Sequence, residues 1–140
     1  ISAEGRIWHR MGDLGYFDDG GYLWFCGRQA ERVDTGRKIY YSDCCEGVFN
    51  RLPEVFRTAL IGWRSGGTVY PAVVVEPVAG AFPKTEADRA CYIEALKKIG
   101  AESEATRSID RFFFEKAFPV DVRHNAKIHR FTLAKRFSNR

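Results

Sequence analysis

The stretch GDLGYFDDGGYLWFCGR, residues 12–28, decides how the first part of the chain folds. Its centre, DDGG, has the composition of a tight turn, and the aromatic segments on both sides have the composition of β-strands. We therefore predict antiparallel strands over residues 6–26, with RIWHRM as the first strand and YLWFC as the second. Asp13 lies in a glycine-flanked bend after the first predicted strand, where its carboxylate can project, and Arg28 ends the unit.

The middle of the chain continues with short elements. Two segments that flank TGR, residues 35–37, predict a second hairpin, and Ser42 or Asp43 can cap a helix that Pro53 ends. FRTALIGW and TVYPAVVVE have strand composition and are separated by the turn RSGG. Pro71, inside the second of these strands, predicts an edge position or a bulge.

The second half predicts two helices and one strand. Thr85 and Asp88 form a capping arrangement for a helix that Gly100 ends. SIDRFFFEK predicts a third strand, residues 117–127 an irregular loop, and IHRFTLAKRF a last amphipathic helix. The apolar residues of that helix available to a core are Ile128, Leu133 and Phe137. Together these elements predict an α+β fold without internal repeats.

The composition is that of a globular protein. Hydrophobic residues make up 45% and charged residues 29% of the 140 residues, so neither disorder nor a membrane protein is indicated. We expect a soluble chain without a membrane span, because the longest apolar runs are far too short to cross a bilayer. The chain begins without an initiator Met or a signal peptide, and we expect it to be a fragment.

The net charge of +4 comes mostly from basic residues after residue 105. A basic tail favours a phosphate-bearing partner, either a nucleotide or a nucleic acid. The four cysteines form no CxxC pair and have no His at zinc spacing; they are Cys26, Cys44, Cys45 and Cys91. We therefore expect reduced thiols, no metal-ligating residues in this chain and a cytoplasmic protein.

Three polar residues are candidates for a site, and the residue types alone leave two interpretations of each. Asp13 can accept hydrogen bonds from the paired hydroxyls of a ribose, or it can cap a turn. Arg28 can reach a phosphate or hydroxyl oxygen, or it can be an exposed residue at a strand end. Lys127 precedes a helix in a polar loop, which can carry it into an anionic site or leave it solvated.

Other polar and aromatic residues receive a structural interpretation. The histidines have no second ligand or nucleophile at an informative spacing and are interpreted as structural or peripheral; they are His9, His124 and His129. Phe112, Phe113 and Phe114 favour core packing over base stacking. A small basic module that binds nucleic acid is a distant alternative, because the basic residues alternate with apolar positions and no reading motif is present.

Two segments resemble adenylate-forming enzymes, the family of acyl-CoA synthetases, luciferases and peptide-synthetase adenylation domains. WHRMGDLGYFDDGGYLWFCGRQAERV resembles the segment in which that family crosses from its large domain into its C-terminal domain, and FPVDVRHNAKIHRFTLAKRF resembles its last motif. The resemblance implies the small C-terminal lid domain of these enzymes, a three-stranded sheet with flanking helices plus an N-terminal β-hairpin. It implies that residues 1–29 are the tail of the large AMP-binding domain and residues 30–140 the lid domain.

Carried over by position, the resemblance implies roles for four residues. Asp13 and Arg28 would bind the ribose and phosphate region of ATP, Lys127 would be the catalytic adenylation lysine, and Ala30 would be the hinge. The implied partners are ATP with Mg²⁺, a fatty acyl substrate and the enzyme's own N-terminal domain, which would hold most of the ATP and Mg²⁺ contacts. The chain alone would be inactive.

One branch of the family is more similar still. LWFCGR, CEGVFNRLPEVFRTALIG and FPVDVRHNAKIHR are similar to olefin β-lactone synthetases of bacterial long-chain olefin biosynthesis. The resemblance implies that ATP activates a 2-alkyl-3-hydroxy fatty acid, whose 3-hydroxyl closes a β-lactone, with other olefin-pathway enzymes as possible partners. Asp34, Cys44 and Cys45 depart from the pattern of CoA-using members, and Ala126 replaces a glycine before the lysine. A long-chain fatty acyl-CoA ligase is the alternative.

Overall fold

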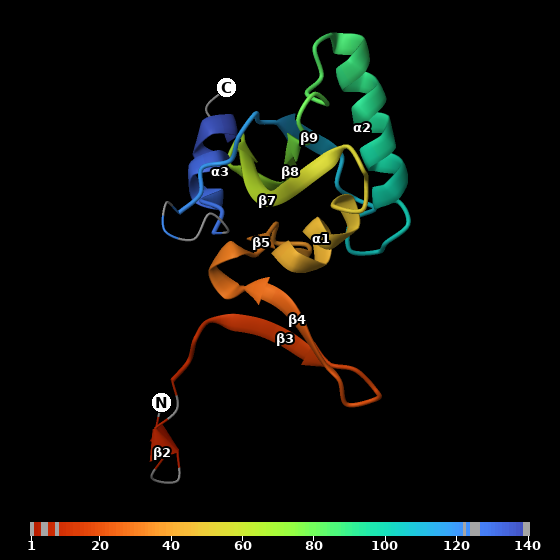
Figure 1. The fold of residues 1–140 in the computed structure, drawn as a ribbon. Helices are drawn as coiled ribbons and strands as arrows, with labels where there is room; N and C mark the ends of the chain where they lie inside the picture. Colours follow the sequence, from red (N-terminus) through yellow and green to blue (C-terminus); the bar gives the residue numbers. More distant parts are fainter. Residues whose placement is uncertain (1, 4–5, 8, 122, 124–126, 139–140) are drawn as a thin grey trace.

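The computed structural model describes residues 2–3, 6–7, 9–121, 123 and 127–138. Figure 1 shows an α+β arrangement in which a three-stranded sheet lies between helices and a hairpin extends away from it. This is the predicted fold class. In chain order the described elements are β1 (Ser2–Ala3), β2 (Arg6–Ile7), β3 (Asp13–Phe17), β4 (Leu23–Arg28), the 3₁₀ turn η1 (Gln29–Glu31), β5 (Val33–Asp34), β6 (Ile39–Tyr40), α1 (Ser42–Phe49), β7 (Val55–Ser65), β8 (Thr68–Pro77), α2 (Glu86–Gly100), β9 (Arg111–Phe114) and α3 (Arg130–Ser138).

The N-terminal hairpin is formed by β3 and β4 rather than by the predicted strand RIWHRM. Asp18 fixes the turn, because its Oδ1 accepts hydrogen bonds from the backbone N–H groups of Gly20 and Tyr22, both at 2.9 Å. The strand that pairs with β4 is therefore β3, which lies directly before this turn. The short strand β2 pairs instead with β1, so the predicted position of the first strand is wrong.

The second hairpin and the first helix follow as predicted, with one difference at the helix start. β5 pairs with β6 across the TGR turn. Helix α1 ends at Phe49, shortly before Pro53. Its N-cap is Tyr41, which makes no side-chain capping bond, so the predicted cap at Ser42 or Asp43 is wrong. The buried Ser42 hydroxyl donates to the Asp43 carboxylate, 3.3 Å away, and caps no backbone N–H.

The three-stranded sheet has β8 at its centre, antiparallel to β7 and parallel to β9. The connection from β8 to β9 contains helix α2, the usual form of a parallel crossover. Pro71 lies in this central strand opposite Gly62, and the register shift of the pair lies between Val55 and Arg57, so the predicted edge position or bulge is wrong. The proline is tolerated because β9 begins to pair only at Ala72, one residue later.

Each face of the sheet has its own hydrophobic core. Successive residues of β7 and β8 point to opposite faces, so their apolar side chains divide between two layers. Figure 1 shows α2 and α3 on opposite sides of the sheet. The core under α1 and α2 includes Phe49, Leu60, Val73, Val75, Leu96 and Phe112. The core under α3 includes Ala59, Ile61, Val74, Leu133 and Phe137.

Helix α2 begins and ends as predicted, whereas α3 begins at Arg130, two residues later than predicted, and keeps its predicted buried face. The Asp88 N–H donates to Thr85 Oγ1 and the Thr85 N–H donates to the Asp88 carboxylate, both at 3.0 Å, which closes the capping box of α2. In α3, the predicted core residues Leu133 and Phe137 are buried. Ile128 precedes the helix and packs half-buried against the same core.

Candidate functional site

The two polar residues that flank the hairpin are paired with each other. Asp13 on β3 lies directly opposite Arg28 on β4. The Arg28 Nε lies 3.0 Å from the Asp13 Oδ1, and the Arg28 Nη1 donates to the backbone carbonyl of Met11 at 3.1 Å. Asp18, rather than Asp13, caps the hairpin turn. The base of the hairpin thus presents a carboxylate and a guanidinium side by side, both about half exposed.

A cleft of about 940 Å³ lies where the hairpin meets the loop before α3. Arg28, Ala30 and Lys127 all line this cleft, and Met11 contributes from the hairpin side. The Lys127 side chain is exposed there. The fold therefore brings three of the four predicted site residues to one cleft, and the fourth, Asp13, adjoins it through its contact with Arg28.

The loop that carries Lys127 is closed by backbone hydrogen bonds. The Asp121 N–H donates to the carbonyl of Lys127 at 3.0 Å, and the His129 N–H donates to the carbonyl of Pro119 at 2.9 Å. These bonds pair residues 119–121 with residues 127–129 directly before α3. Lys127 is the first residue of the second paired segment. Ala126, the predicted departure beside the lysine, lies outside the described residues.

The predicted hinge residue Ala30 lies in η1, a single 3₁₀ turn between the hairpin and β5. Gly27 leads into this turn with φ +117°, a conformation that favours glycine. The Gln29 N–H donates to the carbonyl of Gly12 at 2.8 Å, and Ala30 itself is exposed. The turn is thus tied to the hairpin region through Gln29, and its last residue, Glu31, is held by Arg130 of α3.

Arg130, the first residue of α3, is a residue of this region that the sequence analysis missed. Its Nε and Nη2 donate to the two carboxylate oxygens of Glu46, at 3.0 and 2.8 Å. Its Nη1 lies 2.9 Å from Oε2 of Glu31, the residue that follows Ala30. Glu46 Oε1 also accepts from the Leu60 N–H at 2.8 Å. The three charged side chains are largely buried, with exposures of 14% for Arg130, 17% for Glu31 and 9% for Glu46.

One signal in the sequence points to this cluster. Glu46 falls on the same face of α1 as the buried residues of that helix, and a carboxylate there requires a partner. Burial raises the pKa of Glu46 above its ordinary value, and the Arg130 guanidinium acts against that rise. Burial by itself lowers the pKa of Arg130, but its hydrogen bonds and the charges of Glu46 and Glu31 outweigh burial and raise it. The bidentate contact between Arg130 and Glu46 has the geometry of an ion pair.

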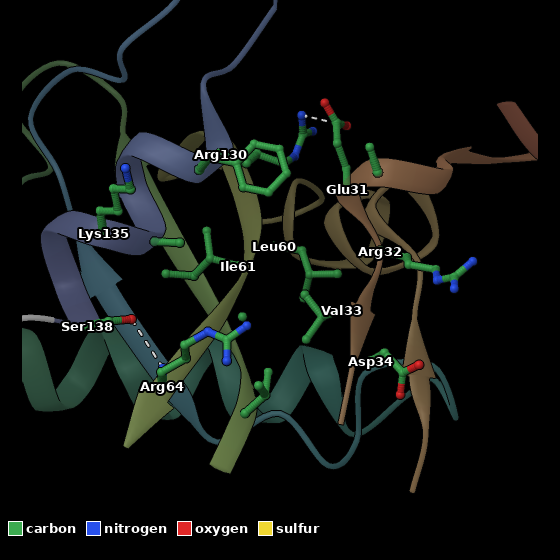
Figure 2. Close-up of a pocket in the computed structure, with 15 residues that line it drawn as sticks. Glu31, Arg32, Val33, Asp34, Leu60, Ile61, Arg64, Arg130, Lys135 and Ser138 are labelled. Carbon is green, nitrogen blue, oxygen red and sulfur yellow. Dashed lines mark hydrogen bonds and ion pairs between the residues drawn. The ribbon is translucent and has the colours of Figure 1, made fainter. Parts of the chain in front are cut away.

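A second cleft, of about 590 Å³, lies between η1, β7 and α3. Figure 2 shows Arg130 and Glu31 at one end of it, Leu60 and Ile61 at its centre, and Arg64 near the other end. Both clefts are lined by residues of η1 and by the start of α3. The Arg130 cluster therefore lies at the boundary between the two clefts.

The residues predicted to depart from the CoA-using pattern have local structural roles. The Asp34 Oδ1 accepts from the Gly36 N–H at 2.8 Å and so caps the turn between β5 and β6. Cys45 is buried, and Cys44 is half-buried with the Cys26 thiol beside it. All four cysteines are free thiols, as predicted.

The remaining candidates are the phenylalanines and histidines, of which His129 lines the cleft that also contains Lys127. Phe112 and Phe114 are buried, and Phe113 stacks on Phe137 with ring centroids 4.7 Å apart, so the core-packing interpretation is confirmed. His9 and His129 are exposed, and His124 lies outside the described residues. Among the described residues, no three or more His, Cys, Asp or Glu side chains are grouped so as to hold a metal ion.

Comparison with known proteins assigns the fold and the sequence to one family. The chain is 44% identical over 129 residues to an olefin beta-lactone synthetase of Stenotrophomonas maltophilia and 45% identical over 133 residues to one of Xanthomonas campestris, each alignment covering 92% of the chain. The chain belongs to the adenylate-forming enzymes. Its fold matches 24% of the crystal structure of the anthranilate CoA ligase AuaEII in complex with anthranoyl-AMP, over 92% of this chain, with a TM-score of 0.77 and 22% identity. No family model matches the chain.

Within an adenylate-forming enzyme, the chain corresponds to the C-terminal domain. It spans 22% and 23% of the length of the two olefin beta-lactone synthetases. The boundary between residues 29 and 30 and the roles of the four site residues stay predictions. Over the residues that the structure describes, the helices are too short or too polar to span a lipid bilayer.

Proposed function

We propose that this chain is the lid, together with the tail of the large domain, of an ATP-dependent enzyme that adenylates a 2-alkyl-3-hydroxy fatty acid and closes it to a β-lactone. The observation that carries the proposal is that Arg28, Ala30 and Lys127 line one cleft. In the sequence, about a hundred residues separate Arg28 and Ala30 from Lys127. The identity of 44% and 45% to proteins named olefin beta-lactone synthetase supports the product class.

The cleft has the polar groups that a nucleotide requires. The Asp13 carboxylate can accept hydrogen bonds from the two ribose hydroxyls, and the adjacent Arg28 guanidinium can donate to ribose or phosphate oxygens. The exposed Lys127 ammonium can approach the α-phosphate. At about 4 Å and an effective dielectric constant near 20, such a charge pair contributes about 4 kcal/mol, which is enough to stabilise developing negative charge.

The proposed reaction has two steps. The substrate carboxylate attacks the α-phosphorus of ATP, which forms the acyl adenylate and releases pyrophosphate. The 3-hydroxyl oxygen then attacks the acyl carbon and loses its proton, the bond from that carbon to the phosphate oxygen breaks, and AMP leaves. Nucleophile and electrophile belong to one molecule in the second step, so no thiol is required and ring closure gains from proximity.

The hairpin supports the proposed domain boundary. Six of its large apolar side chains are more than half exposed: Tyr16, Phe17, Tyr22, Leu23, Trp24 and Phe25. A surface of this kind marks an interaction site. In the proposed enzyme, residues 1–29 complete the large AMP-binding domain, which covers this surface, holds Mg²⁺ and supplies most contacts to ATP and the acyl group. Residues 30–140 form the lid.

A long-chain fatty acyl-CoA ligase is the second candidate, because the fold is shared with an anthranilate CoA ligase. The two candidates differ in product. Mass spectrometry of the complete enzyme with ATP and a 2-alkyl-3-hydroxy acid distinguishes them. A product lighter than the acid by one water, formed without coenzyme A, is the expected result. A thioester formed only with coenzyme A would assign the chain to the ligases instead.

The role of Lys127 has its own test. Lys127→Ala in the complete enzyme is expected to slow adenylation by roughly two to three orders of magnitude, the usual loss for a transition-state charge partner. Pyrophosphate release measures this step directly. Lys98→Ala is the matched control, because Lys98 is exposed on α2, which lies across the sheet from α3. Unchanged pyrophosphate release in Lys127→Ala would contradict the role.

A further inference from the structure

The Arg130 cluster connects two segments that the proposed reaction must move together. Glu31 directly follows Ala30, and Arg130 follows Lys127 by three residues. The 2.9 Å contact from Arg130 Nη1 to Glu31 Oε2 therefore joins the lid side of the hinge to the base of the lysine loop. Rotation at Ala30 can position Lys127 reproducibly only if the structure between them is rigid.

Glu46 anchors this connection in the core. Its carboxylate takes the two-pronged contact from Arg130 and the N–H of Leu60, and α1 and β7 thereby hold the guanidinium in place. Among the interactions described for the cluster, Glu31 contacts only the Nη1 atom of Arg130. Glu46 thus holds Arg130 to the lid, whereas Glu31 ties the hinge to Arg130.

We propose that Arg130 is a positioning residue that binds the hinge turn to the lid through Glu31, so that Lys127 and the lid move about Ala30 as one rigid body. This inference rests on the proposed function, which requires Lys127 to reach a reacting phosphate. The geometric demand is strict, since a displacement of about 1 Å at a reacting centre can lower the rate by about a hundredfold.

The division of roles within the cluster allows a selective test. Glu31→Ala releases the hinge turn but leaves the buried Arg130–Glu46 pair intact, so the lid stays folded. Glu31→Gln removes the charge but keeps an oxygen that can accept from Arg130, and partial rescue is expected. Glu102→Ala is the matched control, because Glu102 forms an exposed pair with Arg51 at 3.0 Å, away from the hinge.

The first readout does not depend on activity. Hydrogen exchange of the complete enzyme, followed on a peptide that covers residues 29–34, reports how firmly the hinge turn is held. Glu31→Ala is expected to raise its exchange rate at least severalfold, Glu31→Gln less, and Glu102→Ala not at all. If the peptide in Glu31→Ala exchanges hydrogen at the wild-type rate, the proposal is overturned, because the contact then contributes nothing to hinge rigidity.

The second readout separates positioning from nucleotide binding. In pyrophosphate exchange, Glu31→Ala is expected to lower kcat about tenfold with the KM for ATP within about twofold, since Lys127 is misplaced but ATP is held elsewhere. Faster hydrogen exchange at the hinge together with an unchanged kcat for pyrophosphate exchange would overturn the positioning role. If the wild-type enzyme releases no pyrophosphate with any acyl substrate, the proposed function fails, while the hydrogen-exchange result still decides whether Glu31 ties the hinge to the lid.

Discussion

Asp13 and Arg28 face each other across the β3–β4 ladder, with the Arg28 Nε 3.0 Å from the Asp13 Oδ1. The two residues proposed to hold the nucleotide are thus already in contact. Arg28 orients the carboxylate that would accept the ribose hydroxyls, and the carboxylate orients the guanidinium. Because both side chains are about half exposed, the pair contributes little to folding, and its main effect is on the arrangement of the site.

Asp13→Ala is therefore expected to affect binding more than stability. In the complete enzyme, the KM for ATP should rise about tenfold or more, as for the loss of charge-assisted hydrogen bonds, while the unfolding free energy changes by less than about 1 kcal/mol. Steady-state kinetics and urea denaturation measure the two effects. Asp19→Ala, an exposed residue of the same hairpin, serves as control and should change neither. A large loss of stability with an unchanged KM would assign Asp13 a structural role only.

Gly27 is expected to tolerate no side chain. Its φ is +117°, and a Cβ there would collide with the Ser42 Oγ and lie 2.7 Å from the Asp43 Oδ2. Gly27→Ala should therefore destabilise the protein by about 2 kcal/mol or more, because both the backbone and the contact with α1 are strained. Gly47→Ala is the contrasting control, since Gly47 lies within α1 with nothing within 4 Å of a new Cβ, and it should stabilise by about 0.5–1 kcal/mol. Equal effects in urea denaturation would contradict the close approach of β4 to α1.

Leu133 is expected to hold α3, and with it Arg130, on the sheet. The side chain is fully buried in the core that α3 covers, so Leu133→Ala should lower the unfolding free energy by about 3 kcal/mol. Phe131, two residues earlier on the same helix, is 68% exposed. Phe131→Ala should therefore change the unfolding free energy by less than about 0.5 kcal/mol. If the two variants unfold at the same denaturant concentration, the assigned face of α3 is incorrect.

The Cys44 and Cys45 thiols predict a loss of stability in alkaline solution. Burial raises the pKa of Cys44 to about 11 and that of Cys45, whose thiol donates to the Ala105 carbonyl at 3.6 Å, to about 12. Since the folded state disfavours the thiolate, this contribution to stability is fully present below about pH 9 and is lost as the pH rises through the raised values.

The melting temperature measured from pH 8 to pH 11 tests this prediction. Cys45→Ala should flatten the decline of Tm with rising pH, whereas Cys91→Ala, at an exposed position, should leave the slope as in the wild type. At pH 8, a disulfide reagent should label Cys91 in the folded protein and Cys45 only after unfolding. Rapid labelling of Cys45 in the folded state would contradict its burial.

The elements that sequence patterns predicted correctly depend on neighbours in the chain. The capping box of Thr85 and Asp88 closes over three residues, and the helical spacing of Leu133 and Phe137 identifies the buried face of α3. The prediction failed where the decisive contact was not visible in the pattern. The turn at Asp18 set the register of the hairpin and moved the first strand to β3, and the place of Pro71 depended on where β9 begins to pair.

The sequence by itself determined the α+β class, the order of the sheet strands and helices, and the candidates Asp13, Arg28, Ala30 and Lys127, because local propensity, capping and the family resemblance are all read along the chain. Only the tertiary structure decided that Asp13 and Arg28 touch and that Arg130 joins Glu31 to Glu46. Glu46 and Arg130 are 84 residues apart. Contacts over such separations are set by how the sheet, α1 and α3 pack, which no local pattern specifies.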